Sequence, residues 1–410
     1  METGEHLYLY KGTVGIPTLA MVDDLAKISL CGVDSVKDNA FVNARIEQDK
    51  LSFNMTKCHH MHSGKTSRLC PGLKAHDSIM DTVLEEKYVG DIISADGKHG
   101  KNTASRRSKG IGVCNEIMHI LNNLCLGPHY FNVALMLRQA MLIQVLLSNS
   151  ETWLRLTKAN LKKLESVDHM LLRKYLQTPI STPIAALFLE TGCIPIRFII
   201  KVRRIMFLHH ILTREAGALI NRVFWAQVET PAPGDWCQVV TEDLKDLGMT
   251  HLNFISISQM KSAALKSLLE KQVERTAHKY LEEEKEKSSK LRSWSFPELK
   301  LQPYLSNICS MPTKTKQLFF KWRTRMIKVG YNYGKREKCP LCADSNDDQQ
   351  HLFNCPELDN NSTQTHNEFI LNADNSNYTD TNWDVTYTSL MRLEKAIRKR
   401  EIILEERAIQ

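Results

Sequence analysis

Two hydrophobic patterns divide this chain. Short apolar runs broken by polar residues fill the first hundred positions and predict small β-strands. Apolar residues run up to Asp23 and Asp24 and resume directly after them, which predicts a tight β-hairpin carrying both carboxylates. A further strand is expected over 50–61. From about residue 101 apolar residues recur at three- and four-residue spacing, which predicts helices.

The helical pattern covers most of the remaining chain. Helices are expected over 35–47, 102–124, 128–212, 260–291 and 383–410, with the stretch 128–212 broken at Pro179 and Pro183. The expected fold is therefore α+β, mostly α, with a small antiparallel sheet at the N-terminus followed by helical regions. Turn-rich and polar stretches divide it into regions 1–100, 101–230, 231–330, 331–358 and 359–410.

Basic residues cluster on two of the predicted helices. Arg106, Arg107 and Lys109 lie near the start of helix 102–124, where positive charge opposes the helix dipole and calls for a partner such as a phosphate. A second basic face, on helix 196–212, contains Arg197, Lys201, Arg203 and Arg204. Either face can follow a nucleic-acid backbone or be a solvated surface, and the pattern leaves both readings open. The charged run 282–287 is expected to be exposed all round.

Composition limits the classes of protein. The 410 residues carry a formal charge of +8, which agrees with a polyanionic partner where the basic residues cluster. Eleven cysteines without a signal-peptide pattern indicate a reducing compartment, so we expect an intracellular protein of the nucleus or cytoplasm that is not secreted. The strongest apolar run, 133–147, is interrupted by Arg138, Gln139 and Gln144, and no membrane span is expected.

Four residues near the end have the spacing of a metal site. Cys339, Cys342, His351 and Cys355 form a Cys-x2-Cys-x8-His-x3-Cys pattern. Two thiolates on a short turn and a His–Cys pair on a following helix can meet at one tetrahedral Zn²⁺, which soft sulfur ligands favour. The competing interpretation is a chance grouping of four residues in a loop-rich region.

Three further motifs follow one another in the first hundred residues. They are the box ending in Asp23-Asp24, the segment Leu51-Ser52-Phe53-Asn54-Met55-Thr56-Lys57-Cys58, and Tyr88-Val89-Gly90. In this order they resemble palm motifs of a reverse transcriptase from a non-LTR (LINE-type) retrotransposon, although Met21 and Val22 depart from the usual box. The zinc pattern, with its basic and aromatic approach, resembles the segment that follows the reverse transcriptase in such transposable elements.

The resemblance implies an organisation and an activity. Region 1–100 would be part of the palm, 101–230 the thumb and connection, 231–330 a helical linker region, 331–358 the zinc segment and 359–410 a polar connector and terminal helix. The implied activity is that of an RNA-directed DNA polymerase, a nucleotidyltransferase, acting on an RNA template and a DNA primer. Asp23 would hold Mg²⁺, Asp24 would support it electrostatically, and Tyr88 and Gly90 would contact the primer.

One family requirement is missing. The family places a further catalytic Asp and the fingers upstream of the Asp-Asp box, and only 22 residues precede Asp23. We therefore expect a fragment that is inactive alone, because the carboxylate that bridges both metal ions is lacking. The alternative is a non-catalytic, zinc-containing nucleic-acid-binding remnant. The sequence does not specify an oligomeric state.

Overall fold

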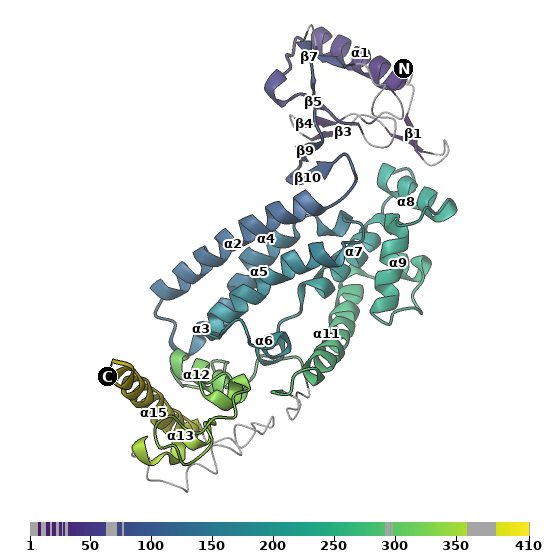
Figure 1. Cartoon of the computed structure of the whole chain (residues 1–410). Helices are drawn as coiled ribbons and strands as arrows, with labels where there is room; N and C mark the ends of the chain where they lie inside the picture. The colour runs from purple at the N-terminus through teal and green to yellow at the C-terminus, as the bar shows by residue number, and fades with distance from the viewer. Residues whose placement is uncertain are drawn as a thin grey trace. The chain divides into compact units, whose positions relative to one another are not determined.

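The computed structural model is mostly helical with short strands (Figure 1). It describes residues 7–9, 14–16, 19–21, 24–26, 28, 32–62, 72–75, 78–291, 296, 298–358 and 383–409. The fold has two compact units. Unit 1 comprises residues 1–109, 147–164 and 199–269, and unit 2 comprises residues 110–146, 165–198 and 270–410. The predicted α+β class, mostly α, is confirmed at this level.

The described strands belong to unit 1 and pair only two by two. The antiparallel pairs are β1 (Leu7–Leu9) with β2 (Val14–Ile16), β3 (Leu19–Met21) with β4 (Asp24–Ala26), β6 (Lys74–Ala75) with β7 (Ser78–Ile79), and β9 (Glu85–Tyr88) with β10 (Asp91–Ser94). β5 (His59–His60) and β8 (Asp81–Thr82) pair in parallel. The expectation of one small antiparallel sheet is therefore wrong for the described residues.

The strand expected over 50–61 is also wrong. Only His59–His60 is extended and paired, and Met55–Lys57 forms a 3₁₀ turn. The Asn54 side chain accepts hydrogen bonds from the Thr56 backbone N–H at 3.2 Å and from the Thr56 hydroxyl at 2.7 Å. Such local bonds to an Asn side chain compete with a β-ladder and favour a turn.

The predicted helices are confirmed, several of them in pieces. The described helices are α1 (Gly32–Gln48), α2 (Gly100–Asn123), α3 (Tyr130–Leu137), α4 (Ile143–Leu147), α5 (Lys158–Leu176), α6 (Ile184–Thr191), α7 (Ile196–Leu212), α8 (Leu219–Glu229), α9 (Trp236–Asp246), α10 (Phe254–Gln259), α11 (Ser262–Glu286), α12 (Thr313–Arg323), α13 (His351–Asn354) and α15 (Trp383–Ile409). Of these, α8, α9, α10 and α12 lie outside the expected helix ranges. A π-helical segment, Arg138–Leu142, joins α3 to α4. The break between α5 and α6 contains Pro179 and Pro183, which cannot continue a helix.

Unit 2 is built around the later half of α2. Cys114, Ile117 and Leu121 recur at helical spacing and are buried. A Cβ added at Gly110 would lie 2.6 Å from the Leu146 side chain and 3.2 Å from Val167. Glycine at this position therefore lets α2 approach α4 and α5 closely.

One apolar run in unit 2 has the composition of a membrane span. Among the described residues, Gly127–Leu147 is long and apolar enough to cross a membrane by length and composition. Phe131 and Leu142 are nevertheless fully buried inside unit 2, and Arg138 forms an ion pair there. Core helices pass the same composition test. The absence of a membrane span stays a prediction.

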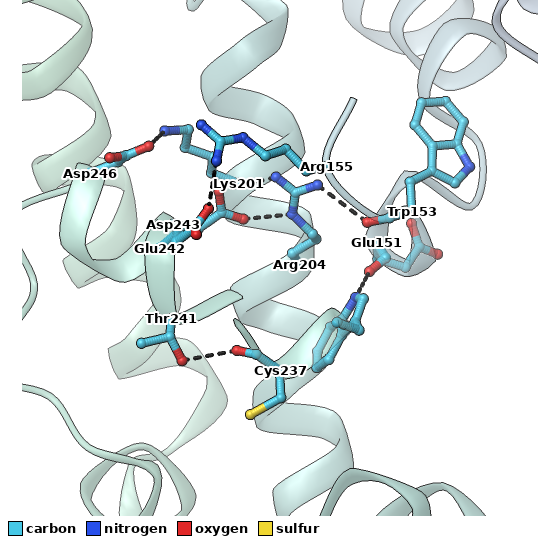
Figure 2. A network of polar contacts seen from close by, with 11 residues as sticks. Glu151, Trp153, Arg155, Lys201, Arg204, Cys237, Thr241, Glu242, Asp243 and Asp246 are labelled. Carbon is cyan, nitrogen blue, oxygen red and sulfur yellow. Dashed lines mark hydrogen bonds and ion pairs between the residues drawn. The ribbon is translucent and has the colours of Figure 1, made fainter. Parts of the chain in front are cut away.

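The predicted basic face of α7 is used inside the protein (Figure 2). Arg204 makes two bonds to Asp243 on α9, Nε–Oδ2 at 2.5 Å and Nη2–Oδ1 at 3.0 Å. Lys201 Nζ lies 2.5 Å from Asp246 Oδ2, and Arg203 donates to the Leu147 carbonyl. These side chains hold α7 against its neighbours within unit 1, so the reading of this face as a phosphate-binding or merely solvated surface is wrong for all three.

Arg197, the fourth basic residue of α7, belongs to unit 2 and is also paired. Its guanidinium bonds both carboxylate oxygens of Glu165, at 2.7 and 3.0 Å, and lies 4.5 Å from the centre of the Tyr280 ring.

The charged run at the end of α11 also contains a basic side chain that is paired inside the protein. Lys285 is buried, with Nζ 2.6 Å from Glu282 Oε2, so the expectation that 282–287 is exposed all round is wrong at this residue.

Two deeper ion pairs fix the core of unit 2. Arg138 bonds both oxygens of Asp168, at 2.6 and 2.7 Å, and donates to the Ile194 carbonyl at 3.1 Å. Arg323 Nε lies 2.9 Å from Glu190 Oε1, and both side chains are fully buried. Removing one member of such a pair leaves the other as an uncompensated buried charge.

We predict that Asp168→Asn lowers the free energy of unfolding of unit 2 by about 3 to 5 kcal/mol, because the buried Arg138 loses its counter-charge. Hydrogen exchange of the buried Leu171 and Leu172 amides measures this loss. Glu394→Gln is the control, since the Glu394–Arg398 pair lies on the surface and such pairs contribute about 0.3 to 0.5 kcal/mol. Equal effects of the two substitutions would contradict the stabilising role of the pair.

Candidate functional site

The four residues of the Cys-x2-Cys-x8-His-x3-Cys pattern converge in unit 2. Cys339 Sγ and Cys355 Sγ lie 3.9 Å apart, and Cys342 Sγ lies 3.3 Å from His351 Nε2. The four ligand atoms all fall within 4.8 Å of one another. Three of the residues are buried and Cys342 is half-buried. The chance-grouping interpretation is therefore wrong: the chain brings these side chains together.

Backbone hydrogen bonds shape the turn that carries Cys339 and Cys342. The Cys339 N–H donates to the Ser345 carbonyl at 2.7 Å, and the Ala343 N–H donates to the Cys339 carbonyl at 2.9 Å. Ala343 takes the left-handed conformation, with φ of 59°, which reverses the chain directly after Cys342. This reversal returns the backbone towards the other two ligands.

The second pair of ligands comes from a short helix. His351 is the first residue of α13, and Cys355 directly follows its last residue. The Asp348 carboxylate accepts a hydrogen bond from the His351 N–H at 2.8 Å and so gives a partner to the first backbone N–H of α13. Phe353 packs edge-on against Trp322 of α12, with ring centroids 5.3 Å apart, which anchors α13 to the core.

The electrostatics differ between the thiols. Backbone N–H groups of Ser345 and Asp344 lower the pKa of Cys342 below its ordinary value and favour the thiolate. Burial raises the pKa of Cys355 to about 12, so a metal must displace its proton on binding. Thiolates are the form in which cysteines bind metals.

The spacing of these atoms fits a tetrahedral metal ion such as zinc. A zinc–sulfur bond of about 2.3 Å gives a sulfur–sulfur separation of about 3.8 Å in a regular tetrahedron. The 3.9 Å between Cys339 and Cys355 matches that edge. Three thiols and one imidazole would fill four positions, which is the composition of a closed, structural site. The same donors do not suit Mg²⁺, which takes oxygen ligands.

Residues next to the cluster form an exposed aromatic and basic surface, which we call the 331–338 surface. Its side chains are Tyr331, Tyr333, Lys335, Arg336 and Lys338, and all five are exposed. Tyr331 is 54% exposed, a large fraction for an aromatic ring. The Lys290 ammonium lies 5.0 Å from the Tyr333 ring centre and adds a positive charge.

The residues that hold α15 against this segment by hydrogen bonds are not predicted by any sequence pattern. Arg400 bonds Asp347 at 2.6 and 2.9 Å, and Arg407 donates to the Pro340 carbonyl at 2.7 Å. Asp347 has no signal of its own in the sequence, because it lies in a polar run with no motif spacing. The Asp348 bond to the His351 N–H also has no sequence signal, because the residue directly before α13 is Gln350.

The predicted polymerase residues are described only in part. Asp23 lies outside the described residues. Asp24 begins β4, and the ladder pairs Met21 with Asp24 and Leu19 with Ala26. The strand pairing expected around the two aspartates is thus present, while their role in holding Mg²⁺ stays a prediction.

Tyr88 and Gly90 lie at the tip of the β9–β10 hairpin. Tyr88 is half-buried and pairs with Asp91 across the turn, while Val89 and Gly90 have φ of 46° and 85°. Two left-handed residues form the type I′ turn that joins β-strands tightly, and Gly suits it. Asn149 Nδ2 donates to the Val89 carbonyl at 3.1 Å and holds the less suitable Val89 in place. This geometry explains Gly90 by the turn alone.

Of the three basic residues predicted on α2, one is internal. Arg106 is buried, and its Nη2 lies 2.7 Å from Asp91 Oδ1. Burial raises the pKa of Asp91, but hydrogen bonds from Arg106 and Asn102 outweigh burial and hold the pKa below its ordinary value. Arg106 therefore fixes the hairpin. Arg107 and Lys109 are exposed.

Comparison with known proteins adds no family assignment. No family model matches this chain, and no curated protein matches it. The functional interpretation therefore rests on the residues and geometry described above, of which the cluster of Cys339, Cys342, His351 and Cys355, able to hold a metal such as zinc, is the most complete.

Proposed function

We propose that this chain is a zinc-stabilised nucleic-acid-binding protein related to the carboxy-terminal part of a non-LTR reverse transcriptase. The observation that carries the proposal is the 331–338 surface, which is exposed beside a cluster suited to zinc. Proteins that bind single strands combine basic side chains along the backbone with aromatic rings on which bases stack. The 331–338 surface offers both kinds of side chain within eight residues.

RNA-directed DNA polymerase activity is the second candidate. It is supported by the paired strands on either side of residues 22–23 and by the β9–β10 hairpin that carries Tyr88 and Gly90. A two-metal polymerase site needs a carboxylate that bridges both ions. Neither β1 nor β2 contains an aspartate. The binding function is therefore the better supported of the two, with an RNA template and a DNA primer as its partners.

We predict that the chain binds one Zn²⁺ and that a chelator disorders residues 331–358 while the helices before Leu212 stay folded. Small metal-closed segments draw most of their folding free energy from the ion, about 10 to 16 kcal/mol in model peptides. Hydrogen exchange with and without chelator, together with metal analysis, measures both effects.

Cysteine substitutions distinguish zinc binding at the cluster from zinc binding by other cysteines of the chain. Cys342→Ser should abolish zinc binding and give the same local disorder, because three remaining ligands do not close the site. Cys125→Ser is the matched control, since Cys125 is exposed and outside the cluster. Zinc retention by Cys342→Ser, or zinc loss in the control, would show that the assigned ligands are wrong.

Nucleic-acid binding is expected to be independent of sequence and sensitive to salt. The double variant Lys335→Gln/Arg336→Gln should bind single strands more weakly and reduce the slope of log affinity against log salt by about 1.4, since each phosphate contact to a single strand contributes about 0.7. Arg107→Gln/Lys109→Gln tests α2 in the same way. Fluorescence anisotropy at several salt concentrations gives the slopes.

The aromatic part of the 331–338 surface has its own test. Tyr331→Ala should cost about 1 to 3 kcal/mol in single-strand binding and less in duplex binding, because only unpaired bases can stack on the ring.

The control for the charge variant Lys335→Gln/Arg336→Gln is Lys271→Gln/Arg275→Gln, which removes the same charges from exposed positions of α11. Equal losses in all these variants, or no binding at low salt, would refute the proposed surface.

Polymerase activity is predicted to be absent from the 410-residue chain assayed alone. Of the described strands that precede Asp24, none carries an aspartate that could bridge two metal ions. Template-primer extension with Mg²⁺ or Mn²⁺ is the assay. Extension above background that disappears in Asp23→Asn would overturn this prediction and favour the second candidate.

A further inference from the structure

Two arginines on one side of the C-terminal helix α15 form hydrogen bonds to residues 331–358, the segment that carries the four predicted ligands and that we call the metal segment. Arg400 is buried and bonds both oxygens of Asp347, which lies between Cys342 and His351 in the chain. Arg407, seven residues later, donates to the carbonyls of Pro340 and Leu341 at 2.7 and 3.4 Å. Both carbonyls belong to the turn between Cys339 and Cys342.

Asp347 connects this fastening to the rest of the segment. Its Oδ2 also accepts the Gly330 N–H at 2.6 Å. Its backbone carbonyl accepts the Tyr331 N–H at 2.9 Å, and its own N–H donates to the Glu337 carbonyl at 3.0 Å. One residue thus bonds α15 by its side chain and the 331–338 surface by its backbone.

The apolar side of α15 completes the contact. Leu390, Leu393 and Ala396 recur at helical spacing and are buried, and α15 packs on α12 and α13. α13 begins at His351 and ends directly before Cys355, so the helix rests on the element that carries two of the four ligands.

We propose that metal binding strengthens the docking of α15 on segment 331–358, and that docking in turn tightens metal binding. The acceptors for Arg400 and Arg407 lie between Cys339 and His351 in the chain, inside the stretch that the four ligands would close around one ion. Metal loss frees these acceptors to move, and the helix loses both polar anchors. By linkage, the factor by which metal strengthens docking equals the factor by which docking strengthens metal binding.

This inference rests on zinc binding by the proposed metal centre and has its own consequence. The segment 331–358 and the C-terminal part of α15 would form one cooperative unit, so metal loss would alter the 331–338 surface and loosen the helix around Arg400 and Arg407. Zinc availability would thereby regulate the nucleic-acid surface through the C-terminal helix.

The test measures zinc affinity by competition with a chromophoric chelator, using the full chain. Arg407→Gln should weaken zinc binding about five-fold or more, and Arg400→Gln more strongly, within the range of about 5- to 150-fold usual for coupled sites. Arg407 is exposed, so its removal leaves the core of the helix contact intact. Arg398→Gln is the control, because Arg398 is exposed and pairs only along α15 with Glu394 at 2.7 Å.

Hydrogen exchange of α15 supplies the reciprocal measurement. In the wild type, chelation should raise exchange at residues 390–407 together with residues 331–358. Failure of the wild type to bind zinc would overturn both the metal centre and the coupling. Zinc binding that Arg400→Gln and Arg407→Gln leave unchanged, with α15 equally protected before and after chelation, would overturn the coupling alone.

Discussion

A guanidinium removed from water must keep a carboxylate beside it, because an unpaired buried charge costs several kcal/mol. The helices of this chain are joined by such pairs: Arg106–Asp91, Arg138–Asp168, Arg197–Glu165, Arg204–Asp243, Arg323–Glu190 and Arg400–Asp347. The Arg106–Asp91 pair joins two neighbouring elements, the other five pairs bridge elements further apart in sequence, and each pair fixes how its elements lie against each other. The same pairs also determine which basic side chains are available to bind phosphates, since an arginine that is paired inside a unit is not available for this role.

This constraint explains what the sequence could predict. Helices and the Cys–His cluster depend on local spacing, so the apolar period and the Cys-x2-Cys-x8-His-x3-Cys pattern identified both. The fate of a charged side chain depends on a partner far along the chain, and no local pattern places Asp168 beside Arg138. For that reason the sequence pattern indicated an open surface on the basic face of α7, whereas Arg204 is buried and Arg197, Lys201 and Arg203 are half-buried and bonded to other parts of the chain. The prediction of a strand over 50–61 was wrong for a related reason, because the Asn54 side chain closes a turn where the apolar pattern favoured a strand.

The metal segment depends both on a local sequence pattern and on contacts between residues far apart in the chain. Its four ligands come from a local pattern, while Asp347, which anchors α15, becomes visible only in three dimensions. Because a small segment such as 331–358 has little core of its own, the ligands and the helix contact share its stabilisation. The exposed rings and basic side chains of the 331–338 surface are held in place by this shared scaffold. The proposed nucleic-acid binding and the proposed zinc site would thus both depend on one local structure, to which the C-terminal helix belongs.

X-ray absorption spectroscopy of the zinc-loaded chain tests the central claim most directly, because it reports the identity and distance of the atoms around the ion. A closed Cys3His site requires three sulfurs at about 2.3 Å and one nitrogen at about 2.0 to 2.1 Å. That result would establish the centre formed by Cys339, Cys342, His351 and Cys355. A shell dominated by oxygen and nitrogen, or one with fewer than three sulfurs, would contradict it.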